Sequence, residues 1–202
     1  MIRLFITGAI RLLAGANIRW IGCMPERKKR IFFANHTSNL DGPVIWAALP
    51  EPIRNGTRLV AAHDYWTANG LRRYMATHVF NTVLIERKKI TVSNNPLNPL
   101  LDALDAGASL IIFPEGGRSR EGDLLPFKSG IYHLSLKRPD VELVPVRIDN
   151  MNRILPKGEV LPVPLLSCLT FGAPMNVGIG EGRDAFLARA RKAVMDLEMA
   201  RT

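Results

Sequence analysis

The chain has 202 residues, of which 47% are hydrophobic and 22% are charged. This composition excludes a disordered chain and a conventional multi-span membrane protein, and the length suits one domain with a sizeable core. The net charge of +9 favours a negatively charged partner, either nucleic acid, an anionic membrane surface, or an acidic substrate or carrier protein. The two cysteines, Cys23 and Cys168, are far apart and fit a reducing compartment rather than a disulfide framework or a zinc site.

The first 22 residues, MIRLFITGAIRLLAGANIRWIG, predict an amphipathic helix that lies in a membrane interface. Three arginines interrupt the apolar sequence, so no run reaches the roughly 18 residues of a membrane-spanning helix, and the apolar core is too short for a signal peptide. On a helical wheel the arginines lie opposite one apolar face, whose members are Ile2, Phe5, Ile6, Ile10, Leu12, Leu13 and Trp20. We expect Trp20 near the lipid headgroups, with the basic segment 27–30 attracting anionic lipid. The alternative is a helix packed on the protein's own core.

From residue 23 onward, short apolar runs rich in β-branched residues alternate with longer helical patterns. The expected strands are Arg30–Ala34, Arg58–Ala62, Thr82–Glu86, Ser109–Phe113, Leu143–Ile148 and Cys168–Phe171. The expected helices are Gly42–Ala48, Asp64–Ala76, Pro99–Ala106, Ser129–Lys137 and Asp184–Met199. Because strands and helices alternate without an evident linker, residues 23–202 are predicted to form a single α/β domain, with a mixed β-sheet flanked by helices.

The segment ANHTSNLDG, residues 34–42, places His36 and Asp41 between an expected strand and an expected helix. On a helix, this spacing would separate the two side chains by about 140°, so they can meet only if the segment turns. Small polar residues between them favour a turn, and Asp41 followed by Pro43 is typical of a helix N-cap. The carboxylate would then fix the imidazole tautomer and make His36 a general base beyond a strand end. The alternative is an aspartate that only caps the helix and a histidine that only bonds to the loop.

Three other segments combine an expected strand with glycine, basic residues or proline. IIFPEGGRSREG, residues 111–122, predicts a strand that runs into a Gly-rich loop with two arginines. Glycines allow backbone N–H groups to approach an anion, and an arginine fork suits a phosphate. VLIERKK, residues 83–89, also ends in a basic cluster, and LVPVRI, residues 143–148, contains a proline that predicts a sheet edge or a bulge.

Together these pieces resemble the glycerophospholipid acyltransferase family, in its PlsC-like, 1-acyl-sn-glycerol-3-phosphate acyltransferase branch. The first motif of the family, NHxSxxD, is matched by NHTSNLD at residues 35–41, and its third motif, FPEGTRS, by FPEGGRS at residues 113–119. Less specific matches are LIER, which ends at Arg87, and the proline-centred VPV of residues 144–146. The order and spacing of the four motifs also fit, and the resemblance covers roughly residues 30–150.

The resemblance implies an O-acyltransferase of phospholipid biosynthesis, which moves a fatty acyl chain from an acyl-CoA or acyl carrier protein thioester to the hydroxyl of a lysophospholipid. The default acceptor is lysophosphatidic acid, which gives phosphatidic acid. His36 would remove the hydroxyl proton, Asp41 would orient His36, and neither a cofactor nor a metal would be required. The implied substrate-binding residues are Arg87, Glu115, Gly116, Gly117, Arg118 and Ser119, with the glutamate holding the arginines or the acceptor in place. The enzyme would be peripheral, at the cytoplasmic face of the inner (plasma) membrane, with a membrane lipid as acceptor.

Several alternatives remain open. Gly117 stands where the family has threonine, so the acceptor could be another lysolipid, such as a lyso-ornithine lipid. A serine hydrolase or thioesterase would use Ser38 or Ser119 with His36, although the sequence has no G-x-S-x-G elbow. A basic nucleic-acid-binding module would suit the charge, but no helix-turn-helix or RNP signature occurs, so we expect no nucleic acid partner.

Three further side chains could belong to the site or only to the fold. His63 follows an expected strand, and a structural role is the expectation for it. His133 lies among apolar residues of an expected helix and is predicted to be a core histidine. Lys128 follows the third motif and either reaches the phosphates of the acyl donor or is simply solvated.

Overall fold

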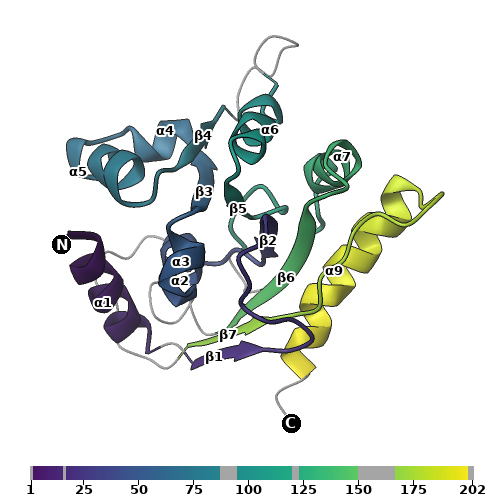
Figure 1. Ribbon diagram of the computed structural model, residues 1–202, viewed down its shortest axis with the longest axis horizontal. Coiled ribbons are helices and arrows are strands. Elements are labelled where there is room, and N and C mark those ends of the chain that lie inside the picture. Colours follow the sequence, from purple (N-terminus) through teal and green to yellow (C-terminus); the bar gives the residue numbers. More distant parts are fainter. Residues whose placement is uncertain (1, 16, 87–94, 120–122, 150–166, 200–202) are drawn as a thin grey trace.

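A computed structural model describes residues 2–15, 17–86, 95–119, 123–149 and 167–199. They form a seven-stranded sheet with the order β1-β7-β6-β2-β5-β3-β4 (Figure 1). The strands are β1 (Asn17–Trp20), β2 (Arg30–Ala34), β3 (Thr57–Ala62), β4 (Val83–Ile85), β5 (Ser109–Ile112), β6 (Glu142–Asp149) and β7 (Cys168–Phe171). Neighbouring strands are parallel, except that β6 and β7 are antiparallel, so the predicted mixed sheet is confirmed.

Helices cover both faces of this sheet. Those in the described ranges are α1 (Ile2–Ala14), α2 (Asp41–Ala48), α3 (Glu51–Arg54), α4 (His63–Trp66), α5 (Gly70–Tyr74), the π-helix η1 (Met75–Val79), α6 (Asn98–Asp105), α7 (Gly130–Lys137) and α9 (Arg183–Met199). Side chains alternate along a strand, and the fully buried strand β2 therefore contributes to two hydrophobic clusters. Phe32 and Ala34 pack with α2, whereas Ile31 and Phe33 pack with α6, α7 and α9.

Most of the expected elements are confirmed to within one residue. β2 and β7 have the predicted bounds, and the other expected strands differ by one residue at one or both ends. The single helix expected over residues 64–76 is wrong, because α4, α5 and η1 take its place. The Asn69 side chain accepts a hydrogen bond from the backbone N–H of Arg72 at 2.9 Å. This N-cap starts a new helix at α5 instead of continuing the previous one.

The N-terminal helix ends at Ala14 rather than continuing to residue 22. Gly15 has a φ of +50°, a left-handed conformation that ends helices, and the following residues join the sheet as β1. Trp20 stacks on Phe171, with ring centroids 4.0 Å apart and an interplanar angle of 9°. The expected position of this tryptophan near lipid headgroups is therefore wrong, because its ring packs on the protein core.

Helix α1 packs against α2 and turns two arginines toward it. Nε of Arg11 donates a hydrogen bond to a carbonyl oxygen of α2 at 2.7 Å, and the Arg3 guanidinium lies 5.4 Å from the ring centroid of Trp46. Ile6 and Ile10 pack against the same hydrophobic cluster. These two isoleucines thus face the core, although the helical wheel placed them on the membrane-facing side.

Pro145 lies inside the sheet and not at the predicted edge. Strand β6 runs between β7 and β2, and Pro145 is aligned with Phe33 of β2. The carbonyl oxygen of Pro145 accepts a hydrogen bond from Gly172, the residue after the last one of β7. Because the N and O atoms of a strand residue point to the same neighbour, the missing N–H of Pro145 faces a position where β7 has already ended.

Candidate active site

The first and third motifs leave the sheet side by side. The neighbouring parallel strands β2 and β5 end at the same edge, with Phe33 aligned with Ile112. His36 follows β2, and the segment that begins at Phe113 follows β5. Crevices at the carboxyl ends of parallel strands are where α/β folds place their ligands. The sheet therefore brings together two motifs that are far apart in the sequence.

Asn35 ties the first motif to the neighbouring strand β6. Its side chain donates a hydrogen bond to the carbonyl oxygen of Ile148 and accepts one from the N–H of the same residue, both at 2.8 Å. The buried amide thus continues the β2–β6 pairing by one residue after the backbone of β2 has turned away. These hydrogen bonds fix the position of the backbone at Asn35, directly before His36.

The Asp41 carboxylate organises the turn that follows. Its Oδ2 atom accepts hydrogen bonds from the backbone N–H groups of Thr37 at 2.7 Å and Ser38 at 2.8 Å. The same oxygen lies 2.9 Å from Nδ1 of His36, and the aspartate is completely buried. The expected N-cap role is wrong, because the capping position is Leu40 and Asp41 is the first residue of α2. The predicted turn and the predicted His–Asp contact are both present.

The imidazole of His36 is held in one orientation. A carboxylate oxygen can only accept, so Nδ1 carries a proton and Nε2 of the neutral ring is left as the basic nitrogen. The ring stacks on Phe113, with centroids 4.1 Å apart and an interplanar angle of 18°. The backbone carbonyl of His36 accepts a hydrogen bond from the N–H of Ser119 at 2.8 Å. No sequence pattern predicted the ring stack, because it depends on the adjacency of β2 and β5.

Glu115 joins three segments of the site. Its Oε1 accepts the backbone N–H of His36 at 2.7 Å, and its Oε2 accepts that of Leu125 at 3.0 Å. The residue is buried, and this burial raises the pKa of its carboxyl group above the ordinary value. Both carboxylate oxygens thus bind backbone N–H groups, whereas the sequence suggested that this glutamate holds the arginines or the acceptor.

The Gly-rich loop after β5 places the remaining predicted residues. Gly116 has a φ of +68°, and a Cβ atom there would lie 2.7 Å from Nζ of Lys128. At Gly117, a Cβ atom would meet no other atom within 4 Å. Arg118 is partly buried and lines a cavity together with His36. Arg87 lies outside the described residues, so its predicted role stays a prediction.

A small cavity with a mixed polar and apolar lining opens in front of His36. Its volume is about 270 Å³, and its walls come from the ends of β2, β3 and β5 and from α2 and α4. The lining residues include His36, Asn39, Gly42, Leu59, Val60, Asp64, Tyr65, Trp66, Phe113 and Arg118. A basic nitrogen and a guanidinium in one cavity can deprotonate one part of a molecule and bind a phosphate of another part.

A second cavity lies beyond Phe113 and is larger and more apolar. Its volume is about 740 Å³, and α6 and α7 supply much of its wall through side chains such as Leu97, Leu100, Ile131 and Leu134. Lys128 and Gly116 line it near the third motif. The sequence predicted the helices but not the cavity, because its shape depends on how both helices pack on the sheet.

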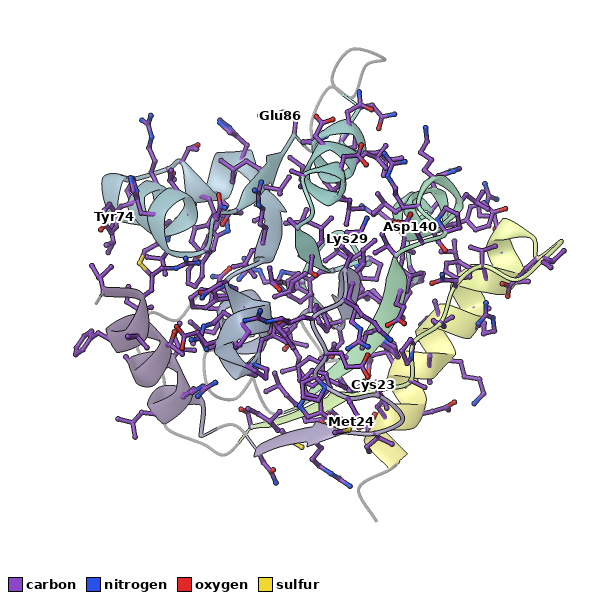
Figure 2. The ribbon with its side chains drawn as sticks, viewed as in Figure 1. Cys23, Met24, Lys29, Tyr74, Glu86 and Asp140 are labelled. Carbon is purple, nitrogen blue, oxygen red and sulfur yellow. The ribbon has the colours of Figure 1, made fainter. Side chains whose placement is uncertain are left out.

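The other histidines lie outside the cavity of His36. Nδ1 of His63 is 3.2 Å from a carboxylate oxygen of Glu86 at the end of β4, which Figure 2 labels, and both side chains are about half exposed. His133 is exposed at the larger cavity, so its predicted place in the core is wrong. Within the described ranges, no group of three or more His, Cys, Asp or Glu side chains is placed to hold a metal ion.

The two candidate serine nucleophiles are poorly placed for a hydrolase. Ser38 is completely buried in the turn, and Ser119 is almost completely buried at the end of the Gly-rich loop. Neither residue is among those that line the two cavities. The geometry therefore favours His36 acting directly on a bound hydroxyl over His36 activating a serine.

Comparisons with known proteins match this arrangement. The model of the family described as "Acyltransferase" matches residues 17–149, which contain all four motifs. A 1-acyl-sn-glycerol-3-phosphate acyltransferase of Limnanthes douglasii is 32% identical over 166 residues, covering 79% of this chain and 56% of that protein. A protein of Dictyostelium discoideum named "Taffazin" is 28% identical over 167 residues, covering 77% of this chain and 55% of that protein. The chain thus spans just over half the length of these curated relatives.

A solved structure shares the fold. The crystal structure of the 1-acyl-sn-glycerophosphate acyltransferase PlsC from Thermotoga maritima superposes with a TM-score of 0.71 at 20% sequence identity, covering 99% of this chain and 81% of that one. The single α/β domain with its mixed sheet is therefore a PlsC-like fold. Because the family model matches well over half of the residues, the chain belongs to the acyltransferase family.

Proposed function

We propose that the protein transfers a fatty acyl chain from a thioester to the hydroxyl of a lysophospholipid, with His36 as the general base. The observation that carries the proposal is the contact of 2.9 Å between Nδ1 of His36 and Oδ2 of Asp41, beside a cavity that also contains Arg118. The family and the names of the relatives support acyl transfer as the reaction.

In the proposed reaction, Nε2 of His36 takes the proton of the acceptor hydroxyl, and the hydroxyl oxygen attacks the thioester carbonyl carbon. A C–O bond forms and the C–S bond breaks. The proton then passes from His36 to the departing thiolate, so no covalent acyl-enzyme is formed. The Asp41 carboxylate stabilises the imidazolium between the two proton transfers. Such a base contributes about 10²–10⁴-fold to the rate.

The two cavities suit the two substrates. Arg118 gives the small cavity a guanidinium that suits a phosphate monoester, which supports lysophosphatidic acid as the acceptor. The larger cavity, at about 740 Å³, is within the roughly 300–1,000 Å³ typical of ligand pockets and would take the acyl chain of an acyl-CoA or acyl carrier protein. The open space at Gly117 favours a lysolipid with a larger headgroup, such as a lyso-ornithine lipid, as the second candidate acceptor.

Helix α1 is proposed to dock in the interface of an anionic membrane at its cytoplasmic face. Four large apolar side chains of this helix are exposed, with exposed fractions of 51% for Ile2, 62% for Leu4, 79% for Phe5 and 83% for Leu12. The α1 helix and the exposed Tyr74 of α5 lie on the same side in the view of Figures 1 and 2. No helix in the described part of the chain combines the length and the apolar composition needed to cross a bilayer.

The test is an acyl transfer assay in liposomes, with wild type beside His36→Ala. Labelled acyl-CoA and acyl carrier protein serve as donors, and a panel of lysolipids serves as acceptors. We expect transfer to lysophosphatidic acid that is lost in His36→Ala while the circular dichroism spectrum stays unchanged. Transfer only to another lysolipid would change the identity of the proposed acceptor and leave the proposed reaction unchanged. Full activity of the variant would rule out the proposed base, and release of free fatty acid without an acceptor would favour a thioesterase.

A further inference from the structure

Phe113 lies against the His36 imidazole and lines both cavities. It is the first residue after β5, and its carbonyl oxygen accepts the N–H of Gly116 at 3.0 Å, which starts the Gly-rich loop. Its ring lies nearly parallel to the His36 imidazole at a centroid distance of 4.1 Å. The Phe113 side chain is only partly buried. Part of it packs against the hydrophobic cluster that includes α2, and the rest faces the cavities.

Val60 and Phe113 line both the small and the large cavity. The small cavity lies against α2 and α4, whereas the large one lies against α6 and α7, the helices that pack on the opposite cluster. The paired parallel strands β3 and β5 end between the two cavities. Val60 belongs to β3, and Phe113 directly follows β5. The side chains of Val60 and Phe113 therefore form a wall between the two cavities, at the edge of the sheet.

The hydrogen bond to Asp41 leaves one motion of His36 uncontrolled. A single contact at Nδ1 holds one edge of the imidazole, but small coupled changes of χ1 and χ2 can still rotate the ring plane while that contact is kept. Such a rotation would swing Nε2 away from the acceptor hydroxyl. A flat ring stacked on the imidazole face opposes this rotation, because tilting would bring the two rings into collision.

We propose that Phe113 positions His36 by stacking, at the wall that it forms with Val60 between the two cavities. This inference rests on the proposed function, since an acyl chain in one cavity and an acceptor hydroxyl in the other must meet at this wall. The thioester carbonyl then lies beside the Phe113 ring, within reach of the hydroxyl that His36 deprotonates.

The experiment distinguishes the effect of a flat ring at residue 113 from the effect of apolar side-chain volume. Phe113→Tyr keeps a ring that can stack, whereas Phe113→Leu keeps apolar volume without one. We expect kcat of Phe113→Tyr to stay within about twofold of wild type, and that of Phe113→Leu to fall by about tenfold or more through misplacement of the base. The NMR titration of the His36 imidazole, which requires no substrate, should shift in Phe113→Leu and not in Phe113→Tyr. Equal behaviour of Leu and Tyr variants in both measurements would overturn the positioning role.

A matched control distinguishes the loss of this ring from a general loss of packing. Phe127→Leu removes another buried aromatic ring that lines neither cavity, and it should leave kcat and the titration of His36 unchanged.

Failure of the proposed function looks different from failure of this inference. If the wild-type protein transfers no acyl chain to any acceptor, the function is wrong, and the NMR titration alone decides whether Phe113 holds His36. If wild type is active and Phe113→Leu matches it in rate and in the titration of His36, the inference is wrong while the function stands.

Discussion

Nδ1 of His36 lies 2.9 Å from an oxygen of Asp41, and that oxygen also accepts the backbone N–H groups of Thr37 and Ser38. One buried atom therefore shapes the turn and orients the imidazole. The exchange of this carboxylate for an amide should affect catalysis more than folding, because an amide oxygen can still accept backbone N–H groups. The neutral amide, however, stabilises the imidazolium much less.

We accordingly expect Asp41→Asn to lower kcat by about 10²-fold or more, with little change in KM. The matched control is Asp102→Asn, an exposed aspartate on α6 that should keep wild-type kinetics. Steady-state kinetics and thermal melts of both variants provide the measurement. An Asp41→Asn enzyme that keeps at least half of the wild-type kcat would contradict the proposed role of the pair.

Glu115 should be important for stability, because it accepts two backbone N–H groups in a buried place. In Glu115→Gln, the amide oxygen can accept one of them, but the NH₂ group faces the other. We expect a loss of about 1–3 kcal/mol in the free energy of unfolding, the usual effect of an unsatisfied buried donor. Urea denaturation measures it, with the exposed Glu51→Gln as a control that should unfold like wild type.

The effect of Glu115→Gln should also depend on pH. Burial raises the pKa of Glu115 above its ordinary value of 4.5, so the folded state holds this proton more tightly than the unfolded state does. The stability that this proton contributes is present below pH 4.5 and is lost as the pH rises through the folded pKa. The deficit of the variant relative to wild type should therefore be larger at about pH 4 than at about pH 8. A deficit that grows with pH would contradict the direction of the shift.

What the sequence could predict depended on how local the determining contacts are. The His36–Asp41 contact forms within one turn, so short-range reasoning about spacing and turn residues was enough. The end of α1 was missed because Trp20 and its neighbours become a strand only through pairing with β7, which comes much later in the chain. The stack of Phe113 on His36 depends on the adjacency of β2 and β5, and no pattern within either motif encodes it.

The outward face of α1 offers a test of membrane docking that leaves the fold intact. Among the side chains of this helix that the structure describes, Phe5 and Leu12 are the most exposed apolar ones, with exposed fractions of 79% and 83%. Full burial of such a side chain contributes about 1.5–3 kcal/mol, so Phe5→Glu with Leu12→Glu should weaken binding to anionic liposomes by about tenfold or more. Liposome flotation measures this. The control Leu136→Glu removes an exposed leucine of α7 and should bind like wild type, so equal losses in both proteins would argue against docking through α1.

Arg118 and Lys128 should affect different substrates. Arg118 lines the small cavity and Lys128 the large one, on the two sides of the Gly-rich loop. Among the described residues, neither side chain has an ion-pair partner. We expect Arg118→Ala to raise KM mainly for the lysolipid and Lys128→Ala to raise it mainly for the acyl donor. Two-substrate kinetics separate the effects, and the same change in both KM values for either variant would refute its assignment.

Gly117 and its neighbour provide a matched pair for the acceptor site. A side chain at Gly117 meets no atom within 4 Å, so Gly117→Thr should fold like wild type. At Gly116, where φ is +68° and a Cβ atom would collide with the Lys128 side chain, Gly116→Ala should lower the free energy of unfolding by about 1–2 kcal/mol. If the open space serves a large headgroup, Gly117→Thr reduces transfer to lyso-ornithine lipid and leaves transfer to lysophosphatidic acid unchanged. Competition assays with both acceptors measure the ratio, and a ratio that does not move would show that residue 117 does not select the acceptor.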